Sequence, residues 1–314
     1  MRSRLKLAAP AALLFLTSSF SLAAQDQDAP QITSSRAFKL SGYTQILYSA
    51  AEDGIDGLSV RRSRFTLAGD LLKNVRFKAT VDLVKSPVLI DAQVEFVLHE
   101  AASLRVGQFK VPFSLEMSTS SGDLDLINRS QPINKLSPSL DIGGGGRDIG
   151  AVVFGKTAFL EYTLGLFNGA GANKADTNDR KDLAGRIVVH PLSFLSLGAS
   201  IYDGSHAVSA GAPSAVRDRI GADLALLRGP FSFKADFLQA EDGDILRRGW
   251  YVQGGYAFLP KTLQGVVRFD GYDPDGAASG DRLDTWTFGL NWFLAGKTKL
   301  QVNYETMRSE SGAN

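Results

Sequence analysis

The sequence contains no cysteine in its 314 residues. This absence excludes disulfide scaffolds, thiolate metal sites and cysteine nucleophiles. Histidine is scarce as well: His99, His190 and His206 lie far apart, without the spacing typical of metal ligands. A serine nucleophile would need a histidine beside it and an orienting partner, and no such arrangement stands out. The sequence therefore predicts no catalytic site, no metal site and no cofactor.

The sequence also lacks an excess of charge of either sign, since 34 Lys and Arg residues stand against 33 Asp and Glu residues. A chain without a basic field is not expected to bind nucleic acid. Long amphipathic helical patterns are missing too. What is abundant is glycine, with 32 residues, and aromatic side chains, at 10%. That composition favours many strands joined by many turns.

The first 24 residues are typical of a signal peptide. Arg2, Arg4 and Lys6 form a basic start, and an apolar run follows that is too short to span a membrane. Small residues around Ala23 and Ala24 offer a cleavage site. Residues 25–36 are polar and without periodicity, so we expect a flexible lead-in there and an exported protein.

From residue 37 onward, segments of about ten residues alternate apolar and polar side chains, which is the period of a β-strand. The clearest segment places Trp286, Phe288, Leu290 and Trp292 on one face and Thr285, Thr287, Gly289 and Asn291 on the other. About fifteen such segments follow one another up to residue 307.

The connections between these segments alternate between short turns and longer polar loops. This alternation is the signature of an outer-membrane barrel, whereas a soluble sandwich has no reason to gather its long loops at one end. We therefore predict an all-β fold, an antiparallel transmembrane β-barrel over residues 37–314 in the bacterial outer membrane. The expected external loops are 51–57, 168–181, 203–216, 241–248 and 273–282, together with one much longer loop.

The strand count is odd, although bacterial single-chain barrels have an even number of strands. About sixteen strands are therefore the expected complement, and we infer that one closing strand is missing. A miscounted pair of strands is the alternative.

The longest loop separates a strand predicted over residues 103–111 from the point at Arg147 where the alternation resumes. Residues 112–146 show no sustained period, and a loop of this length is either functional or evidence against the assignment. We predict that it folds into the barrel as a constriction loop. Its last four residues, Gly143 to Gly146, favour a hinge over an anion-binding nest.

Two segments of the sequence resemble the phosphate- and polyphosphate-selective porin family. They are Gly107-Gln108-Phe109-Lys110-Val111-Pro112-Phe113-Ser114-Leu115-Glu116 and the arginine-dense Val60-Arg61-Arg62-Ser63-Arg64-Phe65. The resemblance implies a sixteen-stranded trimeric channel whose third external loop folds inward. It also implies that phosphate or pyrophosphate passes along arginines to a lysine-containing constriction. The chain departs from the family pattern because it lacks the last strand and its terminal aromatic residue.

The alternation places cations and carboxylates in the lumen in nearly equal numbers. Cross-strand pairs on a wet wall would explain most of them. An anion-selective pore instead needs unpaired cations at its narrowest point. Arg62 and Arg64 are the best candidates, because they share one face of a strand without an acid before Asp70. The candidate pore and anion-binding residues are Arg62, Arg64, Arg76, Lys78, Arg105, Lys110, Arg129, Lys135 and Arg147.

These features predict an outer-membrane porin for passive diffusion of small anions, with phosphate or polyphosphate as candidate solutes. A general porin with little charge selectivity and a plugged structural or adhesive barrel are the alternatives. The expected partners are small inorganic anions, outer-membrane lipid and lipopolysaccharide, and further copies of the chain in a homotrimer.

Overall fold

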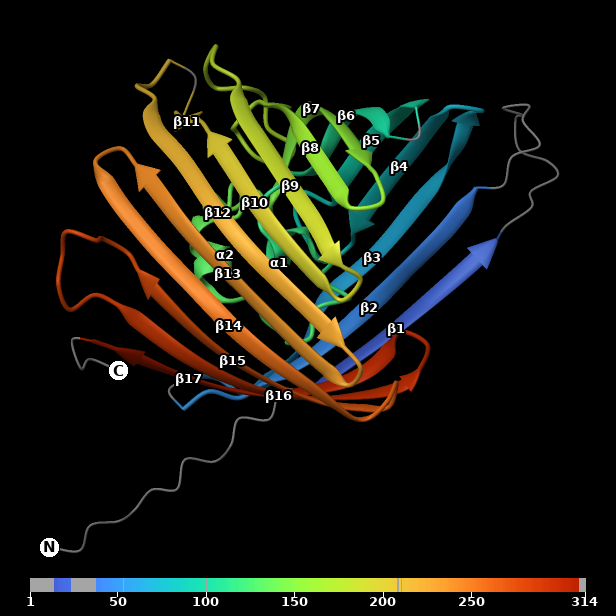
Figure 1. Cartoon of the computed structure of the whole chain (residues 1–314), viewed down its shortest axis with the longest axis vertical. Helices are drawn as coiled ribbons and strands as arrows, with labels where there is room; N and C mark the ends of the chain where they lie inside the picture. Colours follow the sequence, from blue (N-terminus) through green and yellow to red (C-terminus); the bar gives the residue numbers. More distant parts are fainter. Residues whose placement is uncertain are drawn as a thin grey trace, which may run out of the picture.

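A computed structural model describes residues 14–23, 38–52, 54–99, 101–207, 209 and 211–310. Its strands form one antiparallel sheet of seventeen members that curves around two short helices (Figure 1). The elements are β1 (Leu14–Ala23), β2 (Lys39–Ser49), β3 (Gly57–Leu72), β4 (Val75–Asp82), β5 (Leu89–His99), β6 (Ala102–Lys110), α1 (Leu115–Ser118), α2 (Gln131–Leu136), β7 (Arg147–Lys156), β8 (Leu160–Phe167), β9 (Asp182–Leu192), β10 (Leu195–Asp203), β11 (Ser205–His206), β12 (Ala215–Arg228), β13 (Phe231–Asp242), β14 (Ile245–Leu259), β15 (Leu263–Asp273), β16 (Leu283–Ala295) and β17 (Thr298–Ser309).

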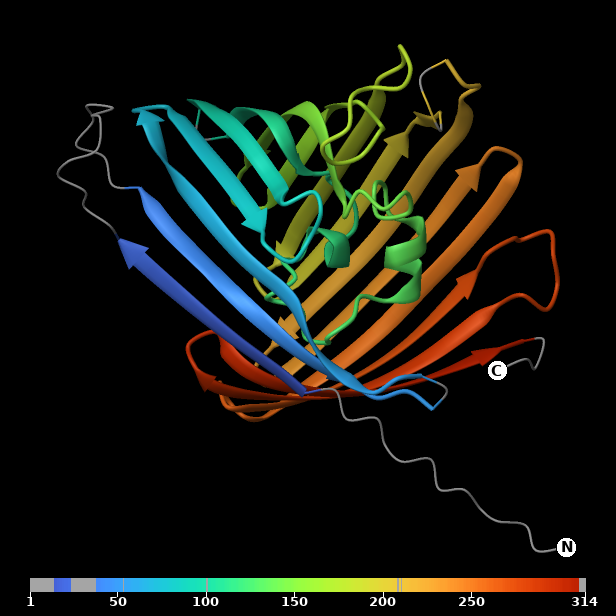
Figure 2. The ribbon, with the colours of Figure 1, turned by 180° about the vertical axis from the view of Figure 1, so that it is seen from behind.

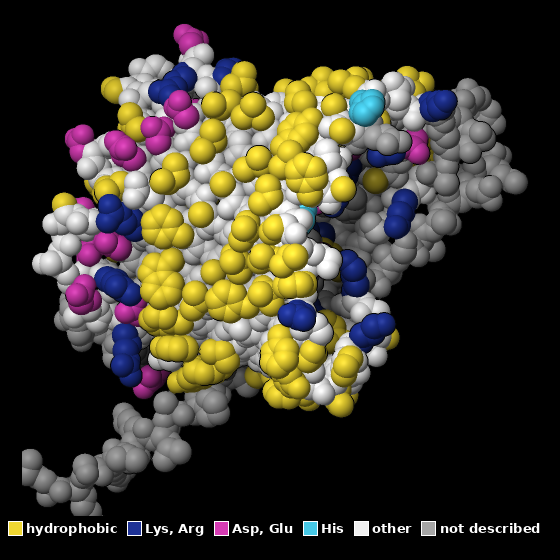
Figure 3. Space-filling model, viewed as in Figure 1, with side chains coloured by type: hydrophobic (Ala, Val, Ile, Leu, Met, Phe, Trp, Pro, Cys, Tyr) yellow, Lys and Arg dark blue, Asp and Glu magenta, His cyan; other side chains and the backbone are white. Residues whose placement is uncertain are grey.

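The two faces of each long strand differ in the sense expected for a membrane barrel. On β16 the apolar Trp286 and Trp292 side chains are 44% and 51% exposed, whereas Thr287 and Asn291 are fully buried. A soluble protein would bury the apolar face instead. The space-filling view has a broad band of hydrophobic side chains over the outer wall, with charged side chains gathered at its margins (Figure 3). No helix in the described part of the chain is long and apolar enough to span a membrane.

The predicted rhythm of fifteen strands is confirmed by β2 to β10 and β12 to β17, while β11 is a two-residue extension that pairs with β12. Successive strands pair with one another from β2 to β17. The edges of β2 and β17 do not pair with each other within the described residues; β1 lies between them. β1 pairs with β2 over ten residues but with β17 over only three.

β1 falls inside the segment predicted as a signal peptide, residues 1–24. The structure describes only residues 14–23 of that segment; its other residues and the predicted lead-in, 25–36, lie outside the described part. A chain whose leader is removed would not carry β1. Protein purified from outer membranes should therefore begin at Ala24 or Gln25 on N-terminal sequencing. A mature chain that begins before Leu14 would refute the predicted cleavage.

One predicted loop is absent from the structure. Residues 241–248 form a hairpin in which β13 and β14 extend to Asp242 and Ile245, so the connection is a two-residue turn. Gly243 has a φ of 61°, a conformation that glycine adopts without steric cost. The polarity of Glu241, Asp242 and Arg247 suggested a loop, but these residues continue the strands at their exposed ends.

The long connection between β6 and β7 folds into the lumen, as predicted (Figure 2). It contains two helices, α1 and α2, that no sequence pattern revealed, because four and six residues are too few to show a helical period. Ser114 caps α1 by accepting a hydrogen bond from the Met117 amide, and proline occupies the first turn of α2. Three of the four glycines at the end of the loop, Gly143, Gly145 and Gly146, adopt positive φ, which fits a hinge returning the chain to the wall.

Candidate functional site

The constriction loop, residues 112–146, is fixed to one side of the barrel by its carboxylates. Asp141 accepts hydrogen bonds from two arginines of β12, with Arg217 Nη2 at 2.5 Å and Arg219 Nη2 at 2.7 Å. Glu116 pairs with Arg268 of β15 at 3.2 Å, and Asp125 lies 2.5 Å from a lysine ammonium of β13, Lys234. Three of the loop's four carboxylates are thus paired with the wall from β12 to β15, and the fourth, Asp123, pairs with Lys297 between β16 and β17.

Apolar contacts hold the same side of the loop. Phe113, Ile133 and Leu136 are completely buried, and they belong to a cluster that includes Leu238 and Tyr251 of the barrel wall. Burying an apolar side chain of this size contributes about 1.5–3 kcal/mol. The loop therefore rests on the wall from β12 to β16 and leaves the passage on the side of β2 to β9.

On this side of the loop lies a small cavity whose lining carries charge of one sign. Its volume is about 180 Å³, and no Asp or Glu is present among the described residues that line it. The lining residues are Arg61, Arg62, Arg64, Lys85, Lys110, Met117, Ser121, Asn128, Arg129, Asn134, Leu140, Gly145, Gly146 and Arg147. Seven of these side chains are cations.

Carboxylates balance only part of this charge. Arg64 pairs with Asp82 at 2.9 Å, and Arg147 pairs with Asp91 at 3.2 Å. Arg62, by contrast, donates to the neutral Gln45 side chain at 2.8 Å, and its Nε is buried without a partner in the described structure. Because a neutral acceptor removes no charge, the cavity stays strongly positive.

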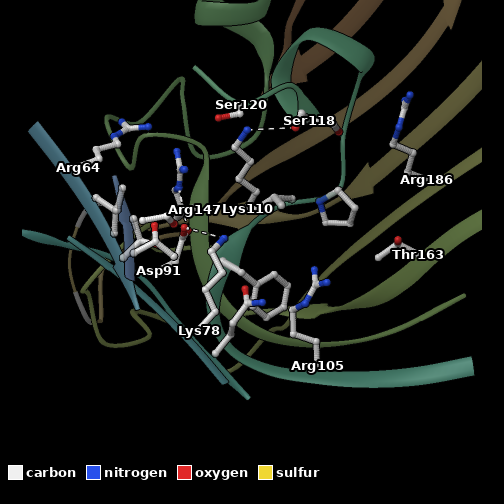
Figure 4. A pocket seen from close by; sticks show the side chains of 18 of the residues that line it. Arg64, Lys78, Asp91, Arg105, Lys110, Ser118, Ser120, Arg147, Thr163 and Arg186 are labelled. Carbon is white, nitrogen blue, oxygen red and sulfur yellow. Dashed lines mark hydrogen bonds and ion pairs between the residues drawn. The ribbon is translucent and has the colours of Figure 1, made fainter. Parts of the chain in front are cut away.

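Lys110 and Arg129 are held in place by backbone carbonyls rather than by acids (Figure 4 shows Lys110 directed at Ser118). Lys110 Nζ donates to the carbonyl oxygens of Met117, Ser118 and Thr119 at 3.0, 3.2 and 2.7 Å. Arg129 donates to the Glu116 and Thr119 carbonyls. These contacts satisfy the free carbonyls at the end of α1 and hold both side chains in place with no carboxylate as the acceptor.

Burial and the mutual repulsion of these cations lower the pKa values of two of them, Arg129 and Lys85. Burial lowers the pKa of Arg129, Glu116 partly offsets that effect, and the nearby Arg147 and Arg64 guanidiniums lower the pKa further. Lys85, in the connection between β4 and β5, has a lowered pKa for the same reasons: burial first, then Arg64 and Arg62. A negatively charged solute in the cavity would relieve this repulsion.

Two lining cations, Arg61 and Lys85, were missed by sequence reasoning. Gln45 pairs with Arg62 and the next residue, Ile46, pairs with Val60, so Arg61 is the extra residue of a β-bulge. Strict alternation places Arg61 on the lipid face, whereas the bulge lets both adjacent arginines line the cavity. Lys85 lies in the short connection between β4 and β5, which the sequence pattern did not link to the pore.

A larger cavity of about 850 Å³ continues the passage toward the short turns and shares Arg64, Lys110 and Arg147 with the small one. Figure 4 shows Lys78 and Arg147 converging on Asp91 in this cavity. Its other cations are largely paired: Arg105 with Glu95 at 2.7 Å, and Arg186 with Asp223. This wall fits the alternative of paired charges along a wet surface.

The structure thus brings seven of the nine candidate residues to the two cavities. Arg62, Arg64, Lys110, Arg129 and Arg147 line the small cavity, and Lys78 and Arg105 line the large one. Arg76 instead pairs with Asp70 at 3.4 Å on an exposed part of the wall. Lys135 is exposed on α2 and is not among the residues that line either cavity.

The described residues contain no cluster of three or more His, Asp or Glu side chains able to hold a metal ion. What the site offers chemically is a charged, water-accessible constriction.

A family model described as "Phosphate-selective porin O and P" matches residues 42–204 and 200–314. The chain belongs to this porin family. Its barrel is therefore that of an outer-membrane porin, and the inward loop and the arginine-dense strand β3 both lie inside the matched region. No curated protein sequence matches the chain significantly.

Solved structures with a similar fold include other porins. An anion-selective porin from Comamonas acidovorans has a TM-score of 0.64 at 15% identity, and the match covers 95% of this chain and 89% of that one. The outer-membrane protein OmpT of Vibrio cholerae, in its trimer form, has a TM-score of 0.57 at 10% identity, covering 95% and 87%. At such low identity these matches establish the porin fold alone.

Proposed function

We propose that this porin passes small anions by passive diffusion and that phosphate is the solute best suited to its constriction. The observation that carries the proposal is the small cavity, which seven cations and no described carboxylate line. Cationic rings at a narrow point select anions because the field at the bottleneck sets the barrier to entry. The family description and the anion-selective relative from Comamonas acidovorans support the same conclusion.

The volume of the cavity suits a small hydrated anion. About 180 Å³ corresponds to the liquid volume of about six waters. Guanidinium groups such as those of Arg61, Arg62 and Arg64 bind phosphate oxygens in pairs and stay charged at physiological pH. Conduction still requires that no single site bind too tightly, and the larger cavity, whose own cations are largely paired, provides a second, weaker position.

A reversal potential tests the proposal. With the purified porin in a planar bilayer and a tenfold gradient of potassium chloride, we expect a potential of the sign set by chloride. Millimolar phosphate should then reduce the chloride current. A reversal potential near zero would favour the general porin, and a bilayer without conductance would favour the plugged barrel.

The assembly and chemistry of the protein are part of the same proposal. We infer a homotrimer surrounded by outer-membrane lipid and lipopolysaccharide, in line with the trimer form of the structurally similar OmpT. We also infer that the chain is a channel without enzymatic activity, as its family is one of porins.

A further inference from the structure

The wall beneath the constriction loop carries glycines where the loop approaches it most closely. Gly221 of β12, Gly249 of β14 and Gly289 of β16 all lie on the inner face, two strands apart. A Cβ atom at these positions would meet Phe113, Pro132 and Leu126, which are three apolar residues of the loop. The glycines therefore let the loop lie closer to the wall than any other residue would allow.

Of these three contacts, the one at Gly249 is the tightest that rotation of a side chain could not relieve. An added Cβ would lie 2.7 Å from Pro132 Cβ and 2.8 Å from Pro132 Cγ, and the proline ring cannot rotate away. Leu126 could relieve the clash at Gly289 by turning the end of its side chain. At Gly221 the nearest atom, Phe113 Cζ, is 3.2 Å away, so the conflict is milder.

Pro132 is the second residue of α2, and the start of this helix is bound to the wall by hydrogen bonds. The Gln131 amide donates to Asp270 at 3.2 Å, and Gln131 Nε2 donates to Thr285 Oγ1 at 2.6 Å. Pro132, Ile133 and Leu136 are buried, whereas Asn134 is exposed and lines the small cavity. A group inserted under Pro132 must therefore push α2 away from the wall and move Asn134 into the cavity.

We propose that Gly249 sets the width of the pore, although it is not among the residues that line either cavity. Because Gly249 has no side chain, α2 packs closely against β14. How closely it packs sets the distance between α2 and the cations on the opposite side of the pore. Gly221 and Gly289 seat the neighbouring parts of the loop in the same way. The inference concerns the size of the passage and does not depend on which ions it prefers.

The test is to measure pore size in the variant Gly249→Ala. Its single-channel conductance in potassium chloride should fall roughly 1.5-fold, because overpacking displaces the helix. For the same reason, the pore should exclude uncharged polyethylene glycols that are small enough to enter the wild-type pore. Gly254→Ala is the matched control: Gly254 lies on the same strand, and a Cβ there meets nothing within 4 Å. The double variant Gly249→Ala with Pro132→Gly, which removes the clashing ring atoms, should recover most of the conductance.

Two results would overturn the proposal. One is wild-type conductance and wild-type polymer exclusion in assembled Gly249→Ala protein. If that variant does not assemble, Gly221→Ala is measured in its place. Its contact with Phe113 is milder, so it should assemble and show a smaller reduction in conductance. The second contradicting result is a wild-type pore size in Gly221→Ala, because it would show that the glycines beneath the loop do not set the width of the pore.

Discussion

Replacing Arg62 and Arg64 with Gln should lower the ratio of anion to cation permeability by at least roughly tenfold. Two unit charges 4 Å apart interact by about 1 kcal/mol in bulk water and about 4 kcal/mol at the dielectric constant near a protein surface. A change of about 1.4 kcal/mol is tenfold in an equilibrium. The loss of Arg64 also leaves Asp82 without its partner, which adds an uncompensated negative charge beside the cavity.

The measurement is the reversal potential in a salt gradient, together with the block of chloride current by phosphate. Arg76→Gln provides a matched control, because Arg76 lies on the neighbouring strand β4 but pairs with Asp70 and is not among the cavity-lining residues. Its removal should leave both quantities unchanged. If the Arg62 and Arg64 variant conducts with wild-type selectivity, the two arginines are only wall charges.

The positive lining of the small cavity could not be predicted from the charge count of the sequence. Cations and carboxylates of the lumen nearly cancel in number, yet the structure separates them. Asp141, Glu116 and Asp125 turn toward arginines and a lysine on one wall, and the cations around Arg62 remain on the other. Which partner a loop carboxylate finds depends on how the loop folds back. That contact joins residues more than 70 positions apart, as between Asp141 and Arg217.

The strand rhythm was predictable because each strand exposes one face to lipid and the other to the lumen, which repeats the same constraint along the chain. The exceptions are local. A bulge at Arg61 breaks the alternation without any change in composition, and the hairpin around Gly243 carries polar residues that look like a loop. The glycine at position 249 was visible in the sequence, but its role depends on Pro132, which packs against it from the loop.

Asp141 offers a test of how firmly the loop is fixed. Although burial alone would raise the pKa of Asp141, Arg217 and Arg219 hold it below its usual value, so the carboxylate is charged at neutral pH. Asp141 and the two guanidiniums are each more than 90% buried. Removing one partner of a buried ion pair costs about 3–5 kcal/mol. Asp141→Asn should therefore release the end of the loop from β12.

The expected result is a noisier and larger single-channel current, because a loop freed from the wall samples more than one position. The folded barrel should also lose its heat resistance at a lower temperature on semi-native gel electrophoresis. Asp176→Asn is the control: Asp176 pairs with Lys181 in an exposed loop, where an ion pair contributes at most about 1 kcal/mol. A quiet channel of wild-type conductance in Asp141→Asn would mean that the buried apolar residues alone hold the loop.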